Sequence, residues 1–338
     1  MKKIILGLPQ TFSLYASIKK NLEFLGYEVI DISYPNHKFK YKNYNQKIIN
    51  FFRKTFLKDT HYKNSLMFQP YRKNTELLLQ AIQTPADAAL LIRADIYPNS
   101  IIHLIKEKCN NLIAYQWDGL DRFPQIYDSI NIFDRFFVFD NSDLHKISHT
   151  AFTTTNFAFD YFKPLNSEKE YDVFYIGSIG GKRINTIKTF IKKTREFNQK
   201  SKFLIHYTYK EDCIETNLNE IEYTNSHITY EENISYVNKS NIIFDLLNES
   251  HNGLSFRVFE AMYYGKKLIT NNSEIKKYEF YHPNNIFVWD GESLAGYDTF
   301  INAPRHTIPK EIIEKYSFTN WIKYILNEPP FMSTAIPL

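Results

Sequence analysis

The sequence has little cysteine, the residue that builds disulfide frameworks and many zinc sites. Cys109 and Cys213 are its only cysteines, and they lie too far apart in the sequence for any zinc-ligand spacing. A D-x-D metal motif is absent, because Asp118 and Asp121 are separated by two residues. These absences indicate a protein of a reducing compartment, and we expect no metal site.

Long apolar runs are missing as well. No run approaches the roughly 18 to 20 residues that a membrane-spanning helix needs, and the run after Lys3 is too short for the apolar core of a signal peptide. We therefore expect a soluble, cytoplasmic protein. Three motifs are also absent: the glycine fingerprint of a dinucleotide site, the Walker A loop and the G-x-S-x-G turn.

The composition is that of an ordinary globular protein, with 43% apolar and 23% charged residues. The length of 338 residues suits two domains better than one. Aromatic residues reach 17%, with 28 Phe and 25 Tyr. A coding bias of the source and a functional need explain this excess equally well.

Short apolar runs alternate with helical patterns along the chain, which predicts an α/β fold with parallel sheets. In the first half we expect strands at 3–8, 27–32, 88–93, 111–117 and 135–139, and helices at 11–25, 74–83, 100–108 and 124–132. In the second half we expect strands at 171–176, 202–207, 227–230, 242–247, 267–270 and 285–289. Helices are expected at 184–191, 231–238, 258–263 and 308–327, the last one broken near Ser317.

The regular pattern weakens between residues 151 and 170, where Pro164 and a polar stretch follow a run of threonines. We place the interdomain linker there. The expected organisation is a first Rossmann-like domain at 1–160, a second at 161–316, and a terminal helix with a tail at 317–338.

The stretch 248–271 predicts a strand, a polar loop, a helix and a second strand. Its loop and helix start carry Asn252, Gly253, Ser255 and Arg257, and Glu260 follows one turn later. Such a loop lies beyond the carboxyl edge of a parallel sheet, where a helix N-terminus offers N–H groups to an anion. On this chemistry alone, a ligand loop and an ordinary crossover are equally good interpretations.

A second loop of this kind follows the strand at 171–176. It contains Gly177, Ser178 and Arg183, together with two further glycines and a lysine, and a helix comes directly after it. Glycine allows a close approach of the backbone, and the cations neutralise charge, so the loop is a reasonable phosphate cradle.

Charged residues accumulate at the carboxyl ends of the strands in the first half. Asp118 follows Trp117 at one of these ends, where burial would suit a general base that accepts a hydroxyl proton. Asp121 is the competing candidate. Both residues could instead cap the helix that follows, and this alternative applies more strongly to Asp121.

The segment 38–73 contains ten Lys or Arg residues and a single acid, Asp59, with aromatic residues interleaved. Such a segment can adsorb to an anionic lipid surface or to a phosphorylated acceptor. The alternative is a solvated helical arm whose aromatic residues face the core. No recognisable nucleic-acid-binding module accompanies the segment, and we expect no nucleic-acid partner.

The segment 253–262, followed by Gly265 and by 267–270, resembles the donor-site motif of the GT-B glycosyltransferases, which use nucleotide sugars. With Arg257 inside the motif it is similar to bacterial polysaccharide and lipopolysaccharide glycosyltransferases of the CgeB-like kind. In the larger retaining group of that superfamily the motif has two glutamates. Glu260 matches the second, and Asn252 stands in place of the first.

The resemblance implies two Rossmann-like domains that face a cleft, with the terminal helix crossing back to the first domain. The first domain would bind a glycan or lipid-linked acceptor and the second a nucleotide sugar, with no cofactor. Arg183 and Arg257, with the amides of Gly177 and Ser178, would hold the diphosphate, and Glu260 the ribose. A nucleotide-sugar epimerase, a polyol-phosphate transferase and a non-catalytic nucleotide or glycan binder remain open as alternatives.

Overall fold

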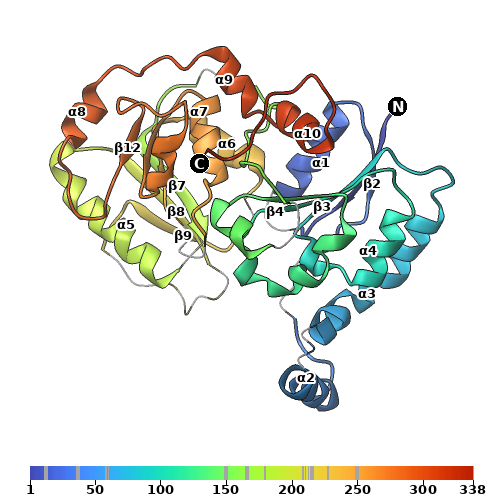
Figure 1. The fold of residues 1–338 in the computed structure, drawn as a ribbon. Coiled ribbons are helices and arrows are strands. Elements are labelled where there is room, and N and C mark those ends of the chain that lie inside the picture. The colour runs from blue at the N-terminus through green and yellow to red at the C-terminus, as the bar shows by residue number, and fades with distance from the viewer. Residues whose placement is uncertain are drawn as a thin grey trace. The chain divides into compact units, whose positions relative to one another are not determined.

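The computed structural model describes residues 1–10, 14–35, 39–57, 59, 61–147, 151–163, 167–178, 180–207, 209, 211, 213, 217–226, 228–247 and 251–337. The chain divides into two compact units. Unit 1 consists of Met1–Thr154 and Ile322–Ile336, and unit 2 contains Thr155–Trp321. Each unit is an α/β domain built on one parallel sheet (Figure 1), so the predicted fold class is confirmed.

The sheet of unit 1 has the strand order β2-β1-β3-β4-β5-β6, and all of its pairs are parallel. Its central strands β3 and β4 are buried along their whole length, as expected for strands covered on both faces. The strands are β1 (Lys3–Gly7), β2 (Glu28–Asp31), β3 (Ala88–Ile92), β4 (Leu112–Gln116), β5 (Arg135–Val138) and β6 (Phe152–Thr153).

The α-helices of Met1–Thr154 are α1 (Leu14–Phe24), α2 (Tyr44–Phe56), α3 (His61–Gln80) and α4 (Asn99–Lys106). Thr11, where we expected the first helix to start, lies outside the described residues. The helix predicted at 124–132 is wrong. The chain forms the short 3-10 helices Pro124–Asp128 and Ile130–Ile132 there, because the turn at Ser129 interrupts the pattern.

The sheet of unit 2 has the order β12-β11-β10-β7-β8-β9 and is also parallel. Its strands are β7 (Tyr171–Ser178), β8 (Ser201–His206), β9 (Ile221–Thr224), β10 (Ser240–Asp245), β11 (Lys267–Thr270) and β12 (Ile286–Val288). The helices that follow β6 in the chain are α5 (Gly181–Thr194), α6 (Tyr230–Asn238), α7 (Phe256–Tyr263), α8 (Tyr297–Asn302), α9 (Lys310–Lys315) and α10 (Phe318–Leu326).

The strand predicted at 227–230 is wrong. His227 lies outside the described residues, and Tyr230 is the first residue of α6. Thr229 caps this helix, because its hydroxyl accepts from the N–H of Glu232 while the Glu232 carboxylate accepts from the N–H of Thr229. The residues of this reciprocal capping box are visible in the sequence. They favour a helix more strongly than the short apolar run favours a strand.

The terminal helical segment is broken near Ser317, as predicted, with α9 before the break and α10 after it. The end of α10 returns to unit 1, since Ile322–Ile336 belongs there. Arg135 of β5 donates to the carbonyls of Tyr324 (3.0 Å) and Ile325 (2.6 Å). The guanidinium thus pairs with carbonyls that the end of a helix leaves unsatisfied.

Much of the aromatic content fills the cores. In unit 2, Phe190 of α5 packs against Phe244 with ring centroids 4.6 Å apart and against Trp289 at 5.2 Å. All three side chains are buried. Within the described part of the chain, no helix is both long enough and apolar enough to cross a membrane.

Candidate functional site

The two loops singled out in the second half of the sequence lie at one point of the unit 2 sheet. Strands β7 and β10 are neighbours, but the chain leaves β7 towards β8 on one side and leaves β10 towards β11 on the other. The connections therefore diverge, and the crevice at such a switch point is where open α/β sheets bind ligands. Of the predicted loop residues, Ile179 and 248–250 lie outside the described part.

Helix α5 begins at this switch point. Gly177 and Ser178 end β7, and Gly180 occupies the position before the first helical residue. Glycine has no side chain to accept from the first-turn N–H groups, so the start of α5 has no side-chain cap, an arrangement that suits an anion. Arg183, on the first turn, makes one weak hydrogen bond within the described residues, from Nη1 to Ser178 Oγ at 3.4 Å.

Helix α7 begins on the other side of the switch point, and it too lacks a side-chain cap among the described residues. Ser255 is at the cap position, but its hydroxyl donates to Asp245 Oδ1 (2.7 Å) and caps none of the described backbone amides. Asp245, the last residue of β10, also accepts from Thr270 Oγ1 (3.1 Å). The buried carboxylate thus diverts the serine from the cap that this residue type usually makes.

Arg257 joins the two strands at the switch point. Its Nε donates to the carbonyl of Ile176 in β7 (2.9 Å), and its Nη1 pairs with Asp245 Oδ1 at the end of β10 (3.0 Å). Burial alone would lower the pKa of Arg257, but the neighbouring Tyr175, Asp245 and Glu260 raise it. The guanidinium therefore stays charged, and its Nη2 has no hydrogen-bond partner among the described residues.

Glu260 lies one turn further along α7 and is only 4% exposed. Burial raises its pKa from 4.5 to about 7, although the charge of Arg257 and hydrogen bonds from Asn233 and Tyr230 act in the opposite direction. Asn233 of α6 lies 3.5 Å from Glu260 Oε2. The carboxyl group therefore titrates near neutral pH beside a permanent cation.

The remaining predicted residues of this group have structural constraints of their own. A Cβ at Gly177 would overlap the phenol of Tyr175, so a side chain is excluded there. The carbonyl of Asn252, whose side chain is exposed, accepts from Asn272 (2.8 Å), and Gly253 is buried. These contacts fix the last part of the loop before α7.

In unit 1, Arg93 follows β3 with φ 60 and ψ 55, a left-handed conformation that is uncommon for residues other than glycine. The guanidinium forms a bidentate pair with Asp95 (2.7 and 2.8 Å) and stacks on Phe123, with Cζ 3.2 Å from the ring centroid. Gln116 donates to the same Asp95 at 3.1 Å. This network holds the strained residue in place.

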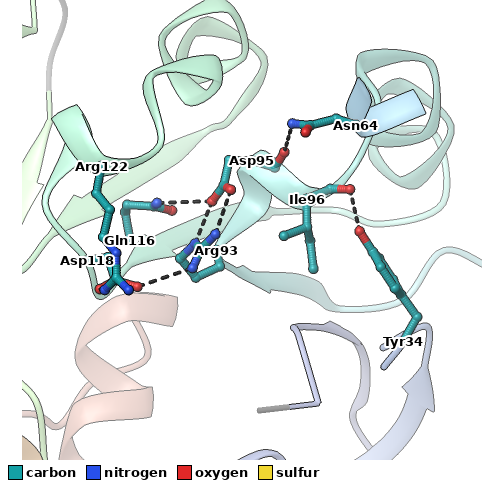
Figure 2. Close-up of polar contacts among 8 residues, drawn as sticks. All are labelled: Tyr34, Asn64, Arg93, Asp95, Ile96, Gln116, Asp118 and Arg122. Atoms are coloured by element: carbon teal, nitrogen blue, oxygen red, sulfur yellow. Dashed lines mark hydrogen bonds and ion pairs between the residues drawn. The ribbon is translucent and has the colours of Figure 1, made fainter. Parts of the chain in front are cut away.

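Asp118 belongs to the network around Arg93 (Figure 2). One carboxylate oxygen pairs with Arg93 at 3.2 Å and the other with Arg122 at 2.6 Å. The side chain of Asp118 is largely buried, at 14% exposure, whereas that of Arg122 is 48% exposed. The structure thus places the candidate base at a strand end, as predicted, and holds it between two guanidinium groups.

Asp121 is separate from this network. Its exposed carboxylate pairs with Lys146 (2.7 Å) and accepts from Tyr127 (3.3 Å). The hydrogen bond from Lys146 lowers the pKa of Asp121. Asp121 lies inside the 3-10 helix Leu120–Arg122, and Phe123 is the cap residue of the next one, Pro124–Asp128, so Asp121 caps neither.

Asp245 and Arg93, which hold these networks together, were not identified as site residues from the sequence. Asp245 ends an apolar strand. A polar residue at such a position only weakly indicates that its side chain pairs with Ser255 and Arg257 at the switch point. Arg93 was predicted only as the last residue of the strand at 88–93. Neither its left-handed backbone nor its pairing with Asp95 follows from residue type. Among the described residues, no three His, Cys, Asp or Glu side chains gather where they could hold a metal ion.

A cavity of about 540 Å³ lies at the opposite edge of the unit 2 sheet, where the strands begin. Asp172, Asn241 and Lys267, from the starts of β7, β10 and β11, contribute to its lining. None of the predicted site residues is among the described residues that line it. It is therefore distinct from the switch-point site.

No protein-family model matches the chain, and no curated protein matches it. Solved structures do. The apo form of the lipopolysaccharide outer core galactosyltransferase WaaB is 13% identical, with a TM-score of 0.51 over 97% of this chain and 100% of that one. A glycosyltransferase from Rickettsia africae is 13% identical, with a TM-score of 0.47 over 89% and 88%. The likeness to WaaB over nearly the whole of both chains shows that this chain has the two-domain α/β fold of the GT-B glycosyltransferases.

Proposed function

We propose that the protein is a glycosyltransferase that moves a sugar from a nucleotide sugar to a bacterial surface glycan of the lipopolysaccharide or capsule type. The observation that carries the proposal is the pair of uncapped helix N-termini, α5 and α7, on the two sides of the β7/β10 switch point. Two uncapped N-termini with Arg183 and Arg257 beside them suit a diphosphate. The fold shared with a lipopolysaccharide galactosyltransferase supports the acceptor class.

In this proposal unit 2 binds the donor. The uncapped N-termini of α5 and α7 hold the diphosphate, with Arg183 and Nη2 of Arg257, while Gly177, Ser178, Asn252, Gly253 and Ser255 shape the loops around it. Glu260 accepts hydrogen bonds from the ribose hydroxyls. The negative charge that develops as the sugar leaves is stabilised by these fixed donors, so the mechanism requires no metal or other cofactor.

Unit 1 binds the acceptor. For an inverting reaction, the acceptor hydroxyl oxygen attacks the anomeric carbon, the bond from that carbon to the diphosphate oxygen breaks, and the hydroxyl proton passes to Asp118. Arg93 and Arg122 orient the Asp118 carboxylate. Asp121 is the second candidate for the base. The acceptor is lipid-linked and lies at the inner face of the cytoplasmic membrane, which the protein reaches through residues 38–73.

A thermal-shift series with UDP, GDP, CMP and dTDP nucleotides tests the donor site. One nucleotide should raise the melting temperature, and its sugar derivative should be consumed when an acceptor glycan is added. Arg183→Ala should weaken nucleotide binding at least about tenfold through the loss of a charged hydrogen bond. Arg195→Ala, an exposed change just beyond the other end of α5, is the matched control.

Three results would contradict the proposal. The first is the absence of a shift with every nucleotide. The second is saturable binding without donor turnover, which describes a non-catalytic binder. The third is conversion of the nucleotide sugar to an isomer without any acceptor, which describes an epimerase.

A further inference from the structure

Helix α2 presents an apolar surface that the rest of unit 1 leaves uncovered. The structure describes all of Tyr44–Phe56, and none of these side chains is buried. Its large apolar side chains are between 43% and 76% exposed: Tyr44, Ile48, Ile49, Phe51, Phe52 and Phe56. Single exposed apolar residues are normal, but six on one helix form a patch that marks an interaction site.

The apolar residues share one side of α2. At about 100° per residue, the six fall within an arc of about 160°. The cations Lys47, Arg53 and Lys54 lie outside this arc and border both of its edges, and the helix sequence contains no acid. An apolar face bordered by cations is typical of a helix that lies in the plane of a membrane surface.

The neighbouring helix α3 shows that the segment 38–73 has two different parts. In α3, Phe68 is fully buried, and Tyr71 stacks on Tyr34 with ring centroids 4.7 Å apart. These two aromatic residues of α3 therefore belong to the core of unit 1, as the helical-arm interpretation required. Those of α2 do not, and Figure 1 shows α2 (blue) beyond α3, away from the sheet of unit 1.

We propose that α2 is the element that docks the protein on an anionic bilayer, with Phe51 and Phe52 among the acyl chains and Lys47 and Lys54 at the lipid phosphates. Charge decides between a bilayer and a second copy of the chain. Two α2 faces would bring like cations together, whereas anionic headgroups neutralise them. The proposed function includes a membrane association, and this proposal assigns that association to α2. Its test does not depend on the identity of the donor.

Flotation of the full chain with vesicles tests the proposal. At about 0.1 M salt, the protein should bind vesicles with about 30% phosphatidylglycerol at least about tenfold more strongly than pure phosphatidylcholine, and about 0.5 M salt should remove most of this difference. Phe51→Ser with Phe52→Ser should weaken binding at least about tenfold. Phe24→Ser, a change at another phenylalanine that is 63% exposed, should not.

A charge-matched pair of double variants separates attraction to anionic lipid from nonspecific adsorption. Lys47→Gln with Lys54→Gln should weaken binding to the anionic vesicles roughly tenfold, whereas the same changes at the exposed Lys192 and Lys193 of α5 should have little effect. Equal binding by the Phe51/Phe52 variant and the unchanged protein would overturn the proposal. So would a dimer in sedimentation that this variant dissociates, since α2 would then be covered by a second copy.

The nucleotide thermal shift, measured on the same α2 variants, keeps the two proposals apart. It should be unchanged, because α2 belongs to unit 1 and the switch-point site to unit 2. A nucleotide shift without vesicle binding would refute only the docking proposal. Vesicle binding without any nucleotide shift would refute only the proposed function.

Discussion

At the scale of single residues, Glu260 makes the stability of unit 2 depend on pH. Its pKa is raised from 4.5 to about 7 in the folded protein. Between these values the folded protein retains a proton that the unfolded chain has released. The contribution of Glu260 to stability is therefore fully present below about pH 4.5 and is lost as the pH rises through about 7.

Replacing Glu260 with Gln should remove this dependence. The stability of Glu260→Gln relative to that of the unchanged protein should rise between pH 5 and pH 8. The rise should be on the order of 3 kcal/mol if the variant loses the whole effect of the pKa shift. Urea unfolding at both pH values measures the difference. Glu311→Gln, at an exposed position on α9, should show no such trend. An equal effect of Glu260→Gln at both pH values would show that the carboxyl group does not titrate in this range.

Arg257 shows how a residue type predicts a site but not its full role. The sequence indicated a cation for a phosphate at this position. The structure adds two bonds within the protein, to Ile176 and to Asp245, and these hold β7 and β10 together at the switch point. Because Arg257→Ala would also leave a buried carboxylate unpaired, Arg183 is the better residue for testing ligand binding alone.

At the scale of elements, the uncapped N-terminus of α5 is the feature most readily tested. Gly180 has φ −158 and ψ 136, an extended conformation that other residues adopt, and a Cβ there would be 3.7 Å from the nearest atom, in Arg183. Gly180→Asp should therefore fit, accept from the first-turn amides and stabilise the free protein by about 1 kcal/mol.

The same aspartate would occupy the amides proposed for the diphosphate and repel its charge. Nucleotide affinity of the Gly180→Asp protein should fall at least about tenfold, which calorimetric titration measures. Gly180→Ala provides neither a cap nor a charge and should change affinity little. If the Asp and Ala variants bind nucleotide equally well, the diphosphate does not lie at α5.

Elements with strong local signals could be predicted from the sequence, and elements without them could not. The strand, turn and helix around Gly177 were predicted because apolar, glycine-rich and periodic stretches follow one another there. The strand at 227–230 was wrongly predicted because three apolar or β-branched residues, at 228–230, favour a strand less strongly than the Thr229 capping box favours a helix. β9 was missed because Ile221 and Tyr223 alternate with polar residues over only four positions.

The candidate site was predictable in its loops but not in its bonds. Ser255 and Arg257 stood out by residue type next to a predicted helix start. Their shared partner Asp245 did not, because contacts across 10 and 12 residues depend on the way β10 and α7 pack. The exposure of α2 is a similar case: an amphipathic pattern fits a core-facing helix and a membrane-docking helix equally well, and only the fold decides.

At the scale of the whole molecule, the same topological feature occurs twice. In each unit, the first strand of the sheet has its sequence neighbour on one side and a later strand on the other: β1 between β2 and β3, and β7 between β8 and β10. Arg93 stands at the end of β3 in one unit, and Asp245 at the end of β10 in the other. Both units therefore place a pairing between an arginine and a carboxylate beside a switch point, where a parallel sheet can receive a ligand.

The chain also returns to its first unit at the end, which makes a long-range prediction possible. Ile325 of α10 is fully buried and belongs to unit 1, although β5 precedes it by nearly 190 residues. Ile325→Ala should leave a cavity that costs about 2 to 5 kcal/mol. Hydrogen exchange should then become faster in β5 and β6 and stay unchanged in β10 and β11.

Ile269→Ala in β11 is the matched control for this prediction, since Ile269 is equally buried but belongs to unit 2. It should speed exchange in β10 and β11 and leave β5 and β6 protected. Faster exchange in β10 and β11 after Ile325→Ala would mean that the end of α10 supports unit 2 instead. The two variants thus determine which unit the last helix stabilises, whatever the arrangement of the two units.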